Sequence, residues 1–571
     1  MRMNLNLFVT TLLRAMLIVS GAGQMEDLTE DEKQIFEHYA AHPLPVNTSD
    51  VRSLRESGLF SEFRAASLAD YISRNGPVLS VRELATVDGF NQEIAEALSW
   101  FISFDTAALR EDRRTVCDSR FQAGASLLQK QSWSWLSNAR LQKGQDYFVN
   151  AGVAGQCLPS GQNIPSISAL TISSSLNFPR AGLKLYLGDF NARFGQGAAC
   201  WNSLLIKSYT SVNSLILKPS GLAESRSDKG NYAKTGLGAR FSFGRCELSL
   251  ALSLPGFKTA LLSSINGNPK GGTGFEPLLN FNWWGRYCSL GLTSVVTILP
   301  SASASVISTA VSADFRTCLR GVDLAGEVAL MVKTHSSHPV VEPAARLACT
   351  VPAGEWFKAG TCLIYTKTRH TASLIFEART PKQHSFALGA CFTNSHSSSG
   401  TSRQTARFDA TASFRWAQVW AWDLRLKENL DFACPQQLVS TLRTDLAASW
   451  ASAWTTSLTA ACSKSSKWGL AIYLEQSFRC LSSVSAHLRA GIFSIDDWDG
   501  RIYFYEYDLP GRFTVPALYG RGYWISAHLG AKIARCFRLD FRLSYKDYAF
   551  MPPDVRKAPA LEARLGFSTN F

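Results

Sequence analysis

The chain has 571 residues, of which 46% are hydrophobic, and its formal net charge is +13. No run of about 18 apolar residues follows the N-terminus, which excludes a bundle of membrane-spanning helices. Two β-rich alternatives remain open. A transmembrane β-barrel needs apolar residues only at alternate positions, whereas the strands of a soluble all-β protein need a second sheet or helices to cover them.

Charge is distributed unevenly along the chain. Residues 25–105 contain six basic and fifteen acidic side chains, which gives a net charge of −9. Two arginines give residues 1–24 a charge of +2, so residues 106–571 carry +20. An acidic N-terminal part and a long basic part attract each other, and this favours their association.

Residues 1–23 predict a secretory signal peptide. Arg2 provides a basic start, residues 15–19 form a short apolar core, and small residues follow it. Arg14 interrupts the apolar stretch. No cysteine follows closely, so we do not expect a lipoprotein.

Residues 25–105 predict a small helical domain. Its acidic first segment favours a helix that Pro43 ends, and Gly76-Pro77 is a strong turn signal. Ser80 and Glu83 have the spacing of a capping box, which predicts the start of another helix.

Two short turns of this domain repeat one pattern of apolar residues around a glycine. The residues that carry the pattern are Val46–Thr48, Leu54, Ser57–Leu59, Tyr71–Ile72, Asn75–Pro77, Leu84 and Val87–Phe90. They resemble a tandem helix-hairpin-helix domain of the type found in competence DNA receptors. In that family the hairpin glycines let backbone amides approach a DNA phosphate. The resemblance places such contacts at Gly58 and Leu59 in the first hairpin and at Gly89, Phe90 and Asn91 in the second.

The same domain departs from the family at the second glycine of each hairpin. Phe60 and Asn91 occupy these positions, and Phe adopts a left-handed conformation poorly. The net charge of −9 also opposes nonspecific DNA binding, which depends on neutralising phosphates with Lys and Arg. A protein-contact or plug-like role is therefore favoured over nucleic acid as the partner of this domain.

Residues 106–571 predict a large β-barrel. In Ala406–Trp416 the apolar side chains occupy every second position, and Arg407 and Asp409 lie on the opposite face. Phe537–Tyr545 and Gly182–Asp189 show the same alternation. Charges at alternate positions suit a water-filled lumen, so we expect an antiparallel transmembrane barrel of roughly 20–26 strands after the all-α domain.

The final segment, Ala560–Phe571, has one apolar and one polar face. A terminal strand leaves no unpaired edge when it meets the first strand of a closed barrel. The segment resembles the C-terminal closing strand of Gram-negative outer-membrane proteins, with Phe571 as the assembly signal. This implies a cell outer-membrane location, with the helical domain in the periplasm. The implied partners are lipid and lipopolysaccharide, the barrel-assembly machinery and a periplasmic protein.

Two local motifs stand out within the barrel, residues 187–197 and residues 500–508. Both resemble recurring segments of a family of barrel proteins that carry the same helix-hairpin-helix module in front. Gly188, Gly195 and Gly197 permit a bend or an inward fold. We expect the polar residues to stabilise the wall and a folded-in loop, with contact to a solute as the alternative; these lumenal candidates are Asp189, Arg193, Gln196, Arg501, Glu506 and Asp508.

Nothing in the sequence identifies an enzyme, a cofactor or a metal site. His335, His338 and Glu342 have a loose spacing in an expected loop, and Asp496 and Asp497 lie in an expected hairpin turn. The 13 cysteines are scattered singly and are expected to pack as small apolar residues.

Three functional hypotheses remain. The first is a transport or secretion component of the outer membrane, whose helical domain closes the lumen or binds a partner. The second is a DNA-uptake component, because a basic barrel attracts a polyanion. The third is a structural protein of the cell envelope.

Overall fold

The computed structural model describes most of the chain. The residues that it describes are 30–47, 49, 51–87, 89–90, 92–104, 115–128, 132–143, 146–157, 166–202, 209–229, 232–266, 272–285, 288–300, 306–319, 321–335, 338–354, 356–380, 384–397, 401–416, 419–433, 438–451, 453–480, 483–512, 514–534, 536–551 and 557–570. The predictions for residues 1–23, Asn91 and Phe571 concern positions outside this set.

Residues 30–104, which we call the helical segment, pack around a core of their own. Ser80 Oγ accepts a hydrogen bond from the Glu83 amide at 3.2 Å, in agreement with the predicted helix start. Phe36, Phe60 and Phe101 are at most 2% exposed and belong to one cluster that contains only residues of this segment. None of the helices in the described ranges is long and apolar enough to cross a membrane. The elements are α2 Glu30–Ala41, β1 Leu44–Pro45, α3 Val51–Glu56, α4 Glu62–Asn75, α5 Val81–Leu84, α6 Gln92–Leu98 and β2 Ile102–Ser103, with β1 and β2 paired in parallel.

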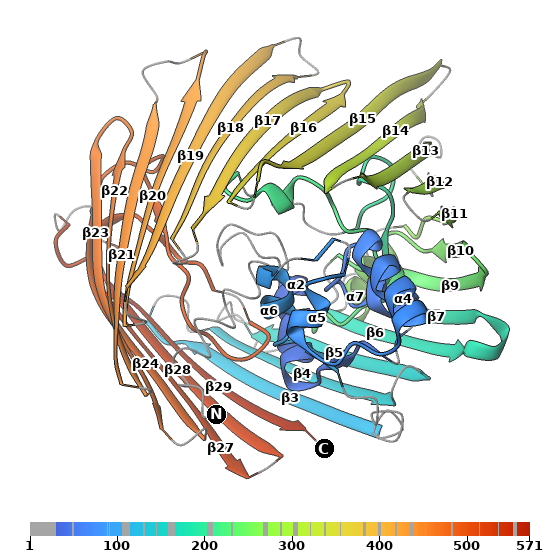
Figure 1. The fold of residues 1–571 in the computed structure, drawn as a ribbon. Helices are drawn as coiled ribbons and strands as arrows, with labels where there is room; N and C mark the ends of the chain where they lie inside the picture. The colour runs from blue at the N-terminus through green and yellow to red at the C-terminus, as the bar shows by residue number, and fades with distance from the viewer. Residues whose placement is uncertain are drawn as a thin grey trace.

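The rest of the chain forms a closed barrel with a wall of 24 antiparallel strands (Figure 1). The wall strands are β3 Thr115–Ser126, β4 Ser132–Lys143, β5 Tyr147–Cys157, β6 Ser166–Phe178, β7 Leu183–Arg193, β9 Lys234–Phe243, β10 Cys246–Ser253, β11 Glu276–Trp284, β12 Cys288–Leu299, β13 Val306–Leu319, β14 Val322–His335, β15 His338–Pro352, β16 Phe357–Thr366, β17 Arg369–Arg379, β18 Ser385–His396, β19 Ser402–Trp416, β20 Trp420–Asp431, β21 Val439–Ala451, β22 Trp454–Lys464, β23 Trp468–Cys480, β24 Val484–Ile495, β27 Gly520–Ala534, β28 Phe537–Asp547 and β29 Ala560–Asn570.

The last strand closes the barrel, as the sequence predicts. β29 pairs antiparallel with β3, and Phe567 lies opposite Phe121. This pairing leaves no free edge in the wall, which a membrane-spanning sheet requires.

Side chains alternate between an apolar outer face and a polar inner face. In β19, Phe408 points outward and is 52% exposed, whereas Asp409 points inward and is 2% exposed. The predicted alternation is thus confirmed, and so extensive an apolar surface indicates contact with lipid. Other outward side chains around the wall are Leu292, Val328, Leu363, Leu388, Leu442, Leu488 and Leu529.

The two mouths of the barrel differ in their connections. The chain enters β3 and leaves β29 at one mouth, where turns are short, such as the one from Phe243 to Cys246; we call it the short-turn mouth. The opposite, long-loop mouth carries the connections β7–β9, β10–β11 and β24–β27. The smaller elements of these and neighbouring connections are η3 Pro179–Ala181, η4 Val212–Ser214, β8 Gly221–Glu224, α7 Phe257–Ile265, β25 Ile502–Tyr503 and β26 Ala517–Leu518. Exposed tryptophans gather at the short-turn mouth, as in the aromatic belt of a membrane interface; they are Trp416, Trp420, Trp450 and Trp454.

Candidate functional site: the contents of the lumen

The helices α2–α6 lie inside the ring of strands, beside β3–β9 (Figure 1). Helix α3 carries the closest contact, through its last two residues. Arg55 Nη2 lies 2.5 Å from Glu247 Oε1 of β10, and Glu56 Oε2 lies 2.8 Å from Lys184 Nζ of β7. Glu56 also forms an ion pair with Arg240 of β9. Two neighbouring helix residues therefore bind three wall strands.

These contacts belong to a buried cluster with balanced charge. Lys184 Nζ lies 2.6 Å from Glu224 Oε1 of β8, and Arg240 Nε lies 3.7 Å from Glu247 Oε2. Removing charged groups from water is costly unless each finds a partner, and here three cations meet three carboxylates. The six side chains are between 0% and 11% exposed; they are Arg55, Glu56, Lys184, Glu224, Arg240 and Glu247.

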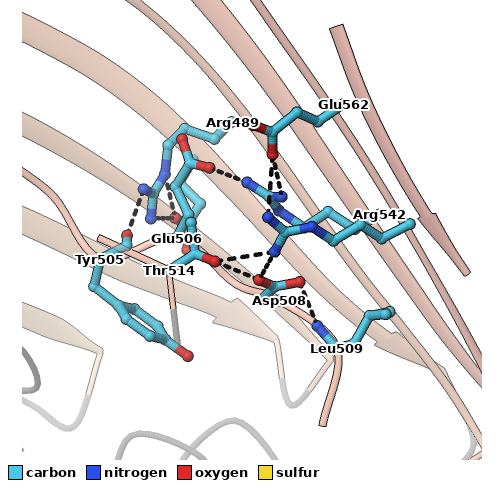
Figure 2. Close-up of polar contacts among 10 residues, drawn as sticks. Arg489, Tyr505, Glu506, Asp508, Leu509, Thr514, Arg542 and Glu562 are labelled. Carbon is cyan, nitrogen blue, oxygen red and sulfur yellow. Dashed lines mark hydrogen bonds and ion pairs between the residues drawn. The ribbon is translucent and has the colours of Figure 1, made fainter. Parts of the chain in front are cut away.

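The β24–β27 connection also folds into the lumen (Figure 2). Glu506 Oε2 lies 2.5 Å from Arg542 Nη2 of β28, and Asp508 forms an ion pair with Arg564 of β29. Arg489 Nη1 donates to the Tyr505 carbonyl oxygen at 2.6 Å. Inward-facing arginines of the wall therefore hold this loop by its carboxylates and its backbone.

This loop touches the helical segment at Gly511. The Gly511 amide donates to Glu37 Oε2 at 3.1 Å, and Gln34 Nε2 donates to the Gly511 carbonyl oxygen at 3.4 Å. Both acceptor and donor side chains come from α2. The β24–β27 loop, which belongs to the long-loop mouth, and the helical segment thus meet within the lumen.

The β7–β9 connection bends inward at Gly188, which has a φ of 85°. Before this glycine β7 pairs with β6, whereas Phe190–Arg193 pair with the inner strand β8. The inward fold expected at this motif is present. Beyond it, Glu327 Oε2 of β14 accepts from the amides of Gln196 at 2.6 Å and Ala198 at 2.8 Å, so a wall carboxylate fixes the loop.

The predicted lumenal residues fall into separate places. Asp189 binds Lys258 of α7 at 2.6 Å, and Arg193 ends β7 opposite Gly221. Gln196 lies 3.3 Å, through Nε2, from the Leu217 carbonyl oxygen. Arg501 lies instead in the turn after β24, where its Nε donates to Tyr503 Oη at 2.5 Å and its guanidinium covers Trp498. Glu506 and Asp508 join arginines of β28 and β29. The six residues therefore lie at several separate places and do not form one network.

The residues predicted to form the two hairpins make hydrogen bonds within the helical segment. Gly58 and Gly89 have φ values of 71° and 86°. The Leu59 amide donates to Ser57 Oγ at 3.1 Å, and the Phe90 amide donates to the Val87 carbonyl oxygen at 3.0 Å. Amides that already have acceptors are poor donors for a phosphate, so this geometry does not favour DNA binding.

The structure also places the residues considered for other chemistry. Glu342 binds Lys333 at 2.6 Å, and the side chains of His335 and His338 lie outside the described set. Asp496 pairs with Arg521, and Asp497 accepts a hydrogen bond from Ser465 Oγ at 2.5 Å. The hairpin tip predicted for these two carboxylates is wrong, because they begin the long connection between β24 and β27. The eleven cysteines listed within the described ranges have free thiols; they are Cys117, Cys157, Cys200, Cys246, Cys288, Cys318, Cys349, Cys362, Cys391, Cys462 and Cys536.

The residues of the buried cluster were not predicted as a site. Lys184 lies on the polar face of a predicted strand, so its inward direction was readable from the alternation. Its partner Glu56 is 128 positions away, and no local pattern links the two.

No protein-family model matches the chain, and no curated protein matches it. Among solved structures, the chain is similar to the P pilus usher PapC translocation pore, with 10% identity and a TM-score of 0.44 over 80% of this chain and 99% of that one. It is also similar to the siderophore receptor PirA from Pseudomonas aeruginosa, with 9% identity and a TM-score of 0.44 over 80% of each chain. The ferric-catecholate import receptor Fiu from E. coli K12 gives 10% identity and a TM-score of 0.37 over 80% of this chain and 82% of that one. Scores this low leave the function to be inferred from the contacts of this chain itself.

Proposed function

We propose that this chain is an outer-membrane β-barrel for transport or secretion, and that its helical segment is a periplasmic plug. The buried cluster around Glu56 carries the proposal, because it fastens the segment to three adjacent strands of the wall, β7, β9 and β10. Its balanced charges account for the stability of the closed state.

The chemistry of this contact favours a plug that moves. The apolar core of the helical segment contains only its own residues, and the segment contacts the barrel through ion pairs, hydrogen bonds and cation–π contacts such as that of Arg55 with Trp284. Leaving the lumen therefore exposes polar groups to water and keeps the segment's own core intact. An interface of this kind resembles contacts between domains that move relative to one another.

The proposed orientation follows from the two mouths. Outer-membrane barrels have short periplasmic turns and longer extracellular loops, so the short-turn mouth faces the periplasm. The helical segment touches the wall near this mouth, at Lys184 and Arg240. In this orientation the proposed plug is accessible to a periplasmic partner, and the outer rim faces lipopolysaccharide.

Planar-bilayer recording tests the proposal. The chain without residues 25–105 is expected to conduct more ions than the full chain. The matched control is Lys333→Ala, which breaks an ion pair at the long-loop mouth without touching the helical segment. Equal conductance of the full and shortened chains would rule out the plug.

A further inference from the structure

His38 of α2, His42 directly after the end of α2, and Asp118 of β3 converge where the helical segment meets the barrel wall. His38 and His42 are four residues apart and lie on the same side of the helix, with ring centroids 5.2 Å apart. Asp118 lies in β3, and its Oδ1 is 3.9 Å from His42 Nε2. One ligand atom from each of the three residues lies within 4.8 Å of the others.

The carboxylate lacks the partner that a buried oxygen needs. Asp118 Oδ1 is buried and accepts no hydrogen bond from any described residue. Such an atom costs free energy unless an ion or a donor satisfies it. It faces the imidazole of His42, so a bound cation between them would remove this cost.

The donor set selects the kind of cation. Two imidazoles and one carboxylate suit Zn²⁺, whereas Ca²⁺ and Mg²⁺ prefer sites built wholly from oxygen. Donors around a tetrahedral Zn²⁺ lie roughly 3.4 Å apart, so these side chains need to approach by about 1.4 Å at most. Asn570 lies beside the site, with Nδ2 3.1 Å from His42 Nε2; if this amide turns over, its oxygen can complete the site, and a water is the alternative.

We infer that His38, His42 and Asp118 bind one Zn²⁺ ion and so join the helical segment to the first strand of the barrel. The site lies beside the β3–β29 closure, on a different part of the wall from the charge cluster at β7, β9 and β10. Its effect on gating rests on the proposed plug function: bound Zn²⁺ holds the segment in the lumen, and removal of Zn²⁺ favours its release.

Metal titration of the full chain refolded in detergent tests the site. Zn²⁺ competition against a chromophoric chelator is expected to show one tight site. Loss of a direct ligand in His42→Ala or Asp118→Asn is expected to weaken binding by at least the ~10–100-fold that loss of an outer-shell partner costs. The exposed histidine variant His396→Ala is the matched control and is expected to bind as the unchanged chain does. Equal affinity in all four proteins overturns the inference.

Two measurements on the unchanged chain do not depend on the folding of a variant. Bound Co²⁺ is expected to give the visible spectrum of a tetrahedral N/O site; a thiolate charge-transfer band would assign the metal to cysteine and overturn the inference. Zn²⁺ is also expected to protect His38 and His42 from carbethoxylation, read by mass spectrometry, and unchanged labelling overturns it.

Bilayer conductance with Zn²⁺ and with a chelator separates the two proposals. Higher conductance after chelation, absent in Asp118→Asn, supports both the site and its role in gating. Zn²⁺ binding without any change in conductance supports the site and overturns its gating role. Absence of binding overturns the site, while the shortened chain still decides the plug.

Discussion

Removing the charge of Glu56 should release the helical segment from the barrel wall. Glu56 is 10% exposed and binds both Lys184 and Arg240, which are 7% and 2% exposed. Glu56→Gln leaves three cations against two carboxylates in the buried cluster. Removing one partner of a buried pair costs about 3–5 kcal/mol, because the other charge stays buried without compensation. If that cost falls on the closed state alone, the ratio of open to closed molecules rises by roughly 10²-fold to 4 × 10³-fold, since about 1.4 kcal/mol corresponds to a factor of ten.

Single-channel recording in planar bilayers measures this ratio as the open probability. The double variant Glu56→Gln/Lys184→Met is the key control, because it removes one charge of each sign and should recover much of the closed state. Lys333→Ala breaks an exposed pair and should change the free energy by at most ~1 kcal/mol. An open probability of Glu56→Gln equal to that of the unchanged chain would refute the assignment of the cluster as the fastening point, and so would additive effects in the double variant.

Two further predictions concern the wall and a loop. Gly188→Ala should lower the yield of folded barrel, measured by heat-modifiable gel mobility, because the φ of Gly188 is 85° and a Cβ there would overlap the Ile172 carbonyl oxygen. Gly244→Ala is the matched control, because Gly244 has a φ of 56° but open space around it. Equal losses of folded barrel in the two variants would show that backbone strain alone acts. Hydrogen bonds from Ser465 and Ser466 lower the pKa of Asp497 to about 2 from 3.8, so its contribution to stability is complete above pH ~4 and is lost as pH falls through about 2. The melting temperature of Asp497→Asn should therefore lie below that of the unchanged chain at pH 6, and the difference should shrink toward pH 2; a difference that is constant with pH would contradict this account.

The barrel was predictable because its signal is local. Alternation with a period of two depends on which face of each strand meets lipid, and every strand shows it independently of its neighbours. β19 and β29 both kept the faces expected for them, and the wall of 24 strands lies within the predicted range. Gly188 of β7 likewise indicated a bend, since the ability to adopt a positive φ is a property of glycine itself.

The contents of the lumen were not predictable in the same way. Glu56 and Arg240 meet because barrel closure and the position of the helices bring them together across 184 residues of chain. Arg501 shows that closeness in the sequence does not ensure contact. It is near Glu506 and Asp508 in the sequence, but its side chain contacts Trp498 and Tyr503. Alternation fixes which side of the wall a side chain faces, and the register of distant strands decides its partner.

The proposed metal site shows why two donors that are visible in the sequence do not by themselves predict a site. The spacing of His38 and His42 was visible in the sequence and places both rings on one side of a helix. A pair of donors one helical turn apart is common, and only a third donor from elsewhere makes a site. The third donor, Asp118, lies in the first strand of the barrel, and no local pattern links it to the two histidines. The sequence therefore directed attention to His335 and His338, whose spacing is looser.

Charge acts at two ranges in this chain. Residues 25–105 carry a net charge of −9 and residues 106–571 carry +20, so the two attract each other over the distance that salt allows, about 10 Å at 0.1 M. The buried cluster itself is neutral, with three charges of each sign, and salt screens buried pairs much less. If the segment is a movable plug, as proposed, long-range attraction brings it to the lumen, and the matched pairs around Glu56 decide how long it stays. High salt should slow the return of a released segment more than it speeds the release of a bound one.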